Sequence, residues 1–371
     1  MKRSTWTGIA LLLLQLILIE TANAQLLSPP TGGNKKASVS EEIGITDVTI
    51  NYSRPHVKHR EGHIWGEVIQ TGYVDMGVGT SKASPWRAGA NENTTIEFST
   101  DIKIEGQPLP AGRYGLFIAY DPNESTLIFS KNSTSWGAFY YNPAEDALRV
   151  KVKPITVDKS VEWLKYEFTD QTSSSAVVQL QWEKQVFPFK VEVDLINTQL
   201  ESFRKELRGI KGFGVWENWD QAASFCADNK VNLEEALLWA NNATDASNGG
   251  SQIFEAWNTK AAILDDLGRS TEAAEIRKKA LPYADMFELY GYARTLAGDK
   301  KIKEALDIFK MDYDKHPDIF LTNTGMARGY MAAGDNKKAL EYALKAQKQA
   351  QGKINMDVIN KIIKDLQSAK M

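Results

Sequence analysis

The chain has 371 residues, a formal net charge of −3 at pH 7 and one cysteine. This balance of charge gives no indication of a nucleic-acid partner or of attraction to an anionic membrane. A single cysteine excludes an internal disulfide, so core burial must stabilise a chain that is long enough for two domains.

The start of the chain has the three parts of a secretory signal. Two basic residues precede an almost continuously apolar run over positions 8–19, and a small-x-small cleavage site ends at Ala24. Residues 1–24 are therefore predicted to be removed, leaving Gln25 as the first mature residue. The apolar run is shorter than the roughly 20 residues that cross a bilayer, so we expect no membrane span after cleavage. The predicted location is periplasmic or secreted.

A β-rich domain is predicted next. Positions 25–37 contain Pro, Gly and Lys and are expected to form a flexible mature N-terminus, and 38–195 are expected to form short strands. Apolar and polar residues alternate along these strands, and turn residues recur about every ten positions, which is typical of an antiparallel β-sandwich or barrel. No helical pattern long enough for a crossover separates them. The expected strands are 48–53, 95–98, 102–105, 114–120, 149–153, 164–168 and 178–183.

Several short sequence motifs in this half resemble those of one protein family. They lie at 52–55, 86–95, 109–117, 136–138, 148–152 and 161–163. Their order resembles DUF2911, a family of exported bacterial domains of unknown function, over roughly Ala37 to Val193. The resemblance implies a β fold and export and assigns no chemistry. The chain departs from the family pattern between Gly66 and Trp86, where it carries a longer loop.

Three of the four histidines lie within eight positions. They are His56, His59 and His63. A turn or short helix that gathered these imidazoles would form a zinc or copper site, which Asp75 or Glu61 would complete. The alternative is that these histidines lie in a solvated basic loop and that the chain binds no cofactor.

A second set of residues has the character of a small-ligand site. Its members are Arg54, Trp86, Arg87, Asn91 and Glu92. An aromatic platform, a guanidinium and an amide are the groups that bind sugars or carboxylates. The same residues also suit a loop held by an Arg–Glu pair and an Asn turn, and both interpretations stay open. No nucleophile motif is present, so the catalytic residues and the question of an enzyme are undetermined.

Five residues have a packing role as their expected function. Trp65, Trp136, Trp163 and Trp182 occupy inward or strand-start positions, which favours core or sheet-edge packing over a carbohydrate surface. Cys226 lies on a small-residue helix face and is expected to be a buried structural thiol.

From Ile196 to Met371 the pattern becomes helical and repeats itself. Alanines that open similar segments occur at 236, 273, 305 and 339, separated by 37, 32 and 34 positions. Gly-containing turns at Gly268, Gly298 and Gly334 precede the last three. A period near 34 with small-large-small spacing resembles the tetratricopeptide repeat. We expect three repeats, a degenerate first one, and a capping helix over 354–366.

These features predict a multidomain protein, β then α. The leading hypothesis is a binding or scaffolding protein whose helical repeats hold an envelope or extracellular protein or peptide. The rival is a small-ligand- or carbohydrate-binding protein, or a metal-assisted hydrolase, with its site in the β domain.

Overall fold

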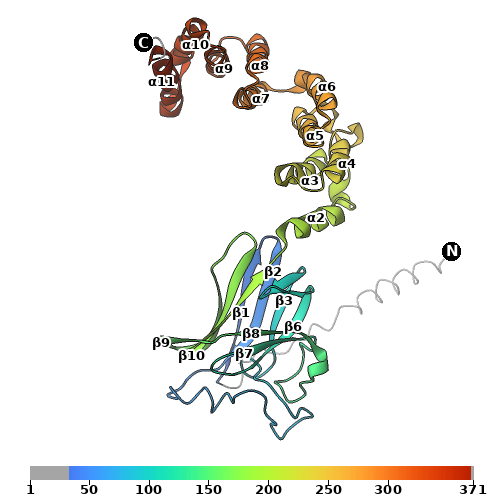
Figure 1. The fold of residues 1–371 in the computed structure, drawn as a ribbon, viewed down its shortest axis with the longest axis vertical. Coiled ribbons are helices and arrows are strands. Elements are labelled where there is room, and N and C mark those ends of the chain that lie inside the picture. The colour runs from blue at the N-terminus through green and yellow to red at the C-terminus, as the bar shows by residue number, and fades with distance from the viewer. Residues whose placement is uncertain (1–32, 369–371) are drawn as a thin grey trace, which may run out of the picture. The chain divides into compact units, whose positions relative to one another are not determined.

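The computed structural model describes residues 33–368, which divide into two compact units between Gln199 and Leu200 (Figure 1). The predicted signal peptide and most of the predicted flexible N-terminus lie outside the described residues. The first unit consists of antiparallel strands and the second of helices. Within 33–368, no helix has the length and apolar character needed to cross a membrane.

The first unit is a β-sandwich of two antiparallel sheets. One sheet has six strands in the order β1-β2-β3-β6-β7-β8, and the other has four in the order β5-β4-β10-β9. The strands are β1 (Lys35–Ile43), β2 (Thr46–Arg54), β3 (Thr94–Phe98), β4 (Ile102–Ile104), β5 (Gln107–Leu109), β6 (Gly112–Ala119), β7 (Ser125–Ser130), β8 (Asp146–Val152), β9 (Ile155–Thr169) and β10 (Ser175–Glu192).

Alternating side chains of both sheets form one core. Ile50 on β2 and Ile96 on β3 pack in the same cluster as Leu164 on β9 and Leu180 on β10. Successive residues of a strand face opposite sides, so the period of two in the sequence specifies which side chains enter this core. The predicted all-β fold without a crossover helix is confirmed.

Three strands were not expected from the sequence: β1, β5 and β7. β1 begins at Lys35, inside the segment predicted to be flexible. It lies at the edge of its sheet and pairs with β2 over its whole length, Lys35 opposite Arg54 and Ile43 opposite Thr46. Only Ile43 of this strand is buried. A polar edge strand has no apolar alternation, which is why its sequence resembles a linker.

The second unit is a series of antiparallel helix pairs. After α2 (Leu195–Glu206), which crosses the division between the units, each pair joins two helices through a short turn. The pairs are α3 (Trp216–Asn229) with α4 (Leu233–Ala243), α5 (Phe254–Asp266) with α6 (Ser270–Ala280), α7 (Met286–Gly298) with α8 (Ile302–Lys315), and α9 (Phe320–Ala332) with α10 (Asn336–Gln349). α11 (Gly352–Ser368) follows as the predicted cap.

The repeating alanines lie where the two helices of each pair meet. All four are on the second helix of a pair, and all four are fully buried: Ala236, Ala273, Ala305 and Ala339. A methyl side chain permits the close approach of two helix backbones, and a larger one would separate them. The alanine period therefore marks one structural position in four successive units, as in tetratricopeptide repeats.

The first helix of every pair ends in the same backbone turn. A residue with positive φ follows the helix, at Lys230 (53°), Gly268 (77°), Lys300 (62°) and Gly334 (79°). The next amide then donates to the carbonyl five residues back, for example Arg269 to Leu264 at 2.8 Å and Lys301 to Leu296 at 2.9 Å. This is the Schellman arrangement, which favours glycine. The predicted turn at Gly298 is therefore displaced by two residues, because Lys300 takes the left-handed position.

The two lysines in left-handed backbone positions give a stability prediction. Lys300→Gly and Lys230→Gly remove the steric cost of a Cβ at positive φ, so each is expected to stabilise the helical unit by about 1 kcal/mol. Gly268→Ala, at the equivalent position, is expected to destabilise it by a similar amount. Urea unfolding followed by far-UV circular dichroism measures all three. A lower midpoint for both lysine variants would contradict this account of the turn.

Candidate functional site

Three of the residues predicted to bind a ligand in the β domain, Arg54, Glu92 and Asn91, have contacts within the domain. Arg54 Nε donates to the Leu164 carbonyl at 2.7 Å. Glu92 accepts from the Ser53 hydroxyl at 3.1 Å and pairs with Lys36 Nζ at 2.8 Å, and this pairing lowers the pKa of its carboxyl. Asn91 has positive φ and accepts from the Asn34 amide. The Arg–Glu pair of the structural alternative is not formed, because Glu92 pairs with Lys36 and Arg54 donates to a backbone carbonyl.

The remaining two predicted residues lie on a pocket. Trp86 Nε1 donates to the Gly89 carbonyl at 3.0 Å, and Arg87 Nη1 donates to the Asn91 carbonyl at 2.7 Å. Both residues line a cavity of about 340 Å³ that Arg54 and Glu92 do not reach. The structure thus divides the predicted set into residues that hold a loop and residues that face an open pocket.

Two of the three clustered histidines, His56 and His63, have different partners. His56 stacks on the Trp163 ring at 4.7 Å, and its Nδ1 lies 3.7 Å from Glu162. His63 Nδ1 lies 3.0 Å from Glu67. Across residues 33–368 no three His, Cys, Asp or Glu side chains are grouped closely enough to hold a metal ion. The zinc or copper site at His56, His59 and His63 stays a prediction.

The residues expected to pack do so with one exception. Trp182 is buried in the core, and Trp65 packs against it at 5.9 Å between ring centroids. Trp136 is 57% exposed, so the core or edge position expected for it is wrong. Cys226 is buried on α3, and burial raises the pKa of its thiol to about 11. A thiol in this environment stays protonated and is not a nucleophile.

A groove of about 430 Å³ lies on the first helices of the repeats, along α3 and the start of α5. Its charged groups are all carboxylates, from Glu217, Asp220, Asp228 and Glu255. The apolar part of its wall comes from Trp216 and Phe225. This groove, called the α3 groove here, contains no basic side chain among its lining residues.

Asp220 is the unusual member of the α3 groove. It is only 5% exposed, and its Oδ1 has no hydrogen-bond partner. Ser224 Oγ reaches the other oxygen at 3.5 Å. Burial, with the negative charge of Glu255 nearby, raises the pKa of Asp220 to about 6. A buried carboxylate with an unused oxygen is costly for the folded chain, and a cation or donor from a partner would relieve that cost.

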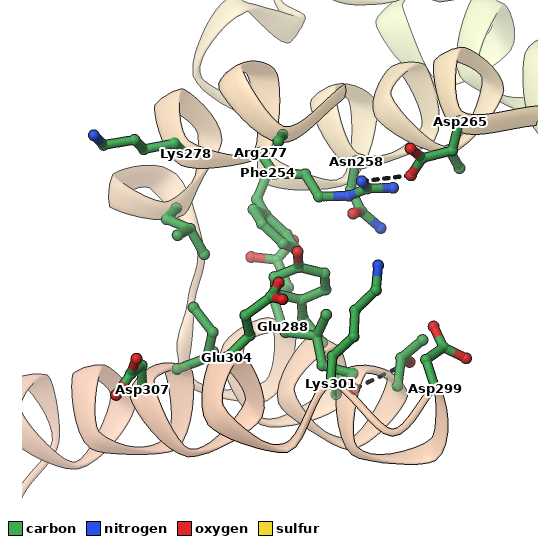
Figure 2. A pocket seen from close by; sticks show the side chains of 18 of the residues that line it. Phe254, Asn258, Asp265, Arg277, Lys278, Glu288, Asp299, Lys301, Glu304 and Asp307 are labelled. Carbon is green, nitrogen blue, oxygen red and sulfur yellow. Dashed lines mark hydrogen bonds and ion pairs between the residues drawn. The ribbon is translucent and has the colours of Figure 1, made fainter. Parts of the chain in front are cut away.

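A larger cleft, of about 1120 Å³, lies between α5 and α6 on one side and α7 and α8 on the other (Figure 2). The aromatic rings of Phe254 and Tyr292 meet edge to face at its floor, 5.8 Å apart. Arg277 on one wall pairs with Asp265 at 2.6 Å, and Lys301 extends into the space from the opposite wall. This cleft is called the α5–α7 cleft here.

Acidic side chains outnumber basic ones in the α5–α7 cleft. The lining carboxylates are Glu255, Asp265, Asp266, Glu288, Asp299, Glu304 and Asp307, and the lining cations are Arg277, Lys278 and Lys301. Glu255 lines the α3 groove as well. The two hollows therefore meet at α5 and form one acidic surface along successive repeats.

Sequence reasoning did not find this surface, although its signal is present. Glu217, Asp220, Ser224 and Asp228 recur at helical spacing, so they share one face of α3, opposite the buried Ala222, Ala223 and Cys226. The sequence of each single helix predicts only an ordinary amphipathic helix with one solvent-exposed face. Only the stacking of repeats brings the acidic faces together.

The family comparison agrees with the fold. Residues 34–191 match the model of the family described as "Protein of unknown function (DUF2911)". The resemblance found in the short sequence motifs is confirmed. The chain carries a DUF2911 domain followed by tetratricopeptide-like repeats. A comparison with curated proteins finds no match.

Several solved repeat proteins are similar to the helical part. PilF from Pseudomonas aeruginosa shares 16% identity over 42% of this chain and 68% of that chain, with a TM-score of 0.31. A putative kinesin light chain of Podosopora anserina shares 15% over 42% and 85%, at 0.31. MamA from Desulfovibrio magneticus RS-1 shares 15% over 44% and 96%, at 0.28. The helix pairs and buried alanines of this chain identify the repeat on their own.

Asp220 gives the site a pH-dependent stability. Because its folded pKa of about 6 lies above the ordinary 3.8, the folded chain holds a proton that the unfolded chain has lost between these values. This contribution to stability is complete below about pH 4, is lost as pH rises through 6, and is absent above. Asp220→Asn has no carboxyl group to ionise and so avoids the cost of burying the charged form, and the variant is expected to exceed the parent in stability above pH 6 by on the order of 2 to 3 kcal/mol.

The measurement is urea unfolding across pH 4 to 7, with Asp228→Asn, at an exposed carboxylate of the same helix, as the matched control. Asp228→Asn is expected to keep the pH dependence of the parent. An Asp220→Asn profile parallel to that of the parent would exclude Asp220 as the titrating group.

Proposed function

We propose that this chain is an exported binding protein that holds a protein partner by a lysine- or arginine-rich segment, seated along the acidic surface of its repeats. The tetratricopeptide-like fold suggests protein partners, because stacked helix pairs present long grooves that fit an extended or helical segment. The partner is expected in the envelope or outside the cell. The proposal needs no catalytic residue.

The observation that carries the proposal is the junction at Glu255. The α3 groove and the α5–α7 cleft share this side chain, so carboxylates are found from α3 to α8 and outnumber the three cations of the cleft. A formal charge of only −3 for the whole chain means that this acidity is local. Charges gathered in a groove attract an oppositely charged segment and hold its register.

Two features suit a basic segment rather than a metal ion or a small cation. The surface spans several repeats, far more than one ion occupies, and its floor includes aromatic rings. A lysine or arginine side chain places its apolar stem on rings such as Phe254 and Tyr292 and its charged end near carboxylates.

Charge reversal tests the surface. The probe is an oligoarginine peptide, compared with a citrulline peptide of the same length, which has the same shape and no charge. Titration calorimetry on the full chain is expected to show binding of the arginine peptide that weakens as salt rises. Glu255→Lys, at the junction of both hollows, is expected to weaken it by about tenfold or more, through the loss of one attraction and the gain of one repulsion.

Glu275→Lys is the matched control, since Glu275 is an exposed carboxylate on α6 that lines neither hollow. It changes the net charge equally and is expected to leave affinity within about twofold of the parent. Equal losses of affinity in both variants would mean that peptide binding depends only on the net charge of the chain. Equal binding of the citrulline peptide would remove the acidic surface from the proposal.

Export is the second part of the proposal, and it is supported by the sequence pattern of the first 24 residues. If a signal peptidase cleaves after Ala24, the mature protein begins at Gln25. Intact-mass measurement of the protein from fractionated bacterial cells is expected to give that start in the envelope or medium fraction. Replacing Ala22 and Ala24 by leucine is expected to block cleavage and leave the longer mass, because the cleavage site requires small side chains. A full-length mass from the parent would contradict export by this route.

A further inference from the structure

The β domain contains a pocket that the protein-binding proposal does not use. It is the 340 Å³ cavity beside Trp86 and Arg87, within the range of sizes that hold small molecules. Its other walls combine apolar side chains, Val68, Ile69, Met76 and Pro85, with the polar side chains of Gln70, Asp75 and Ser84. It lies in the first unit, and the acidic surface lies in the second.

The pocket is built by the long loop in which the sequence departs from its family pattern. The loop folds back on itself where the amides of Val74 and Ser84 exchange hydrogen bonds of 3.0 and 2.8 Å with each other's carbonyls. Further bonds attach it to the domain: Gly72 donates to Tyr120 at 2.7 Å, and Ser84 Oγ donates to Ala138 at 2.8 Å. Since both edges are hydrogen-bonded, the pocket walls are held in place without a ligand.

Arg87 is the charged group of this pocket that lacks an opposite charge. Its guanidinium lies 5.3 Å over the Phe139 ring, and the backbone of Gly137 is so close that a Cβ there would be 2.5 Å from Cζ. One N–H group is used by the Asn91 carbonyl. Within residues 33–368 it forms no ion pair, since the pocket's carboxylate, Asp75, pairs with Lys82 at 3.2 Å. Burial lowers the pKa of Arg87.

A partly buried guanidinium held from behind by a ring and a glycine is a preorganised receptor for a planar oxyanion. The carboxylate matches the fork of N–H groups, and the partial burial of Arg87 strengthens the attraction. The apolar walls select a ligand that has a hydrophobic body as well as an anionic end. A neutral sugar would leave the charge of Arg87 without compensation, and a cation would be repelled by it.

We propose that this pocket binds a small organic carboxylate, with the carboxylate on the Arg87 guanidinium and the apolar part against Trp86, Ile69 and Val68. The ligand class follows from the charge and the walls together. This binding site is independent of the partner surface on the repeats, so either proposal stands if the other fails.

Calorimetry with the full chain tests the proposal, with phenylacetate, acetate and 3-phenylpropionate as probes and phenylacetamide as the neutral analogue. Phenylacetate is expected to bind at least tenfold more tightly than phenylacetamide, because the charge-assisted hydrogen bonds are lost in the amide. Acetate, which lacks the apolar body, is expected to bind more weakly than phenylacetate. Equal affinity for acid and amide, or no binding of any carboxylate into the millimolar range, would overturn the proposal.

Two variants and a matched control complete the test. Arg87→Gln is expected to weaken phenylacetate binding by at least tenfold. Arg54→Gln is the control, since Arg54 also donates to a backbone carbonyl at 2.7 Å and does not line the pocket. Val68→Glu leaves every contact of Arg87 in place and sets a carboxylate at a half-exposed wall position, so it is expected to abolish binding. Melting temperatures establish that each variant is folded, and unchanged affinity in folded Arg87→Gln or Val68→Glu would refute the site.

Discussion

The contact on which the repeat domain depends is the close approach of two helices at a buried alanine. This contact occurs once in each of four units and uses the small-residue face of the second helix. The apolar faces are consumed by packing within and between pairs, so the outer face of each first helix is left for polar groups. Stacking then brings these faces together with polar positions of the second helices α6 and α8, and the acidic surface from α3 to α8 is a product of that arrangement. One spacing rule thus positions both the core and the binding surface.

The sequence predicts best where a pattern is local and periodic. Alternation located most strands, and the alanine period located every helix pair. Prediction from sequence fails where a residue's partner is distant in the chain. β1 forms a strand because it pairs with the edge of β2. Arg54 donates to the carbonyl of Leu164, more than a hundred positions away. The acidic surface is not predicted from the sequence for the same reason, since no single helix contains it. Lys300 shows a local failure, in which glycine is present but a neighbour takes the strained position.

Asp220 and Arg87 are alike in one respect, although they have opposite charges and lie in different units. Each is a titratable side chain that is largely removed from water without an ionic partner among the described residues. A fold selected only for stability would pair or replace such groups. Unpaired buried charge is a common feature of binding sites, where the missing partner arrives with the ligand. Under the two proposals, these positions are where each unit would give up stability for recognition.

The position of the α5–α7 cleft has a consequence for how the helical array unfolds. Repeat arrays behave as one-dimensional chains in which neighbours stabilise one another, and cooperativity breaks where the coupling between neighbours is weakest. Backbone contacts are extensive between α4 and α5 and between α8 and α9, but sparse between α6 and α7, where the α5–α7 cleft lies. That junction divides the array into two blocks, α3 to α6 and α7 to α11, which are only weakly coupled to each other. A segment that fills the cleft would contact both blocks, so binding would make the array melt as one unit and transmit order along it.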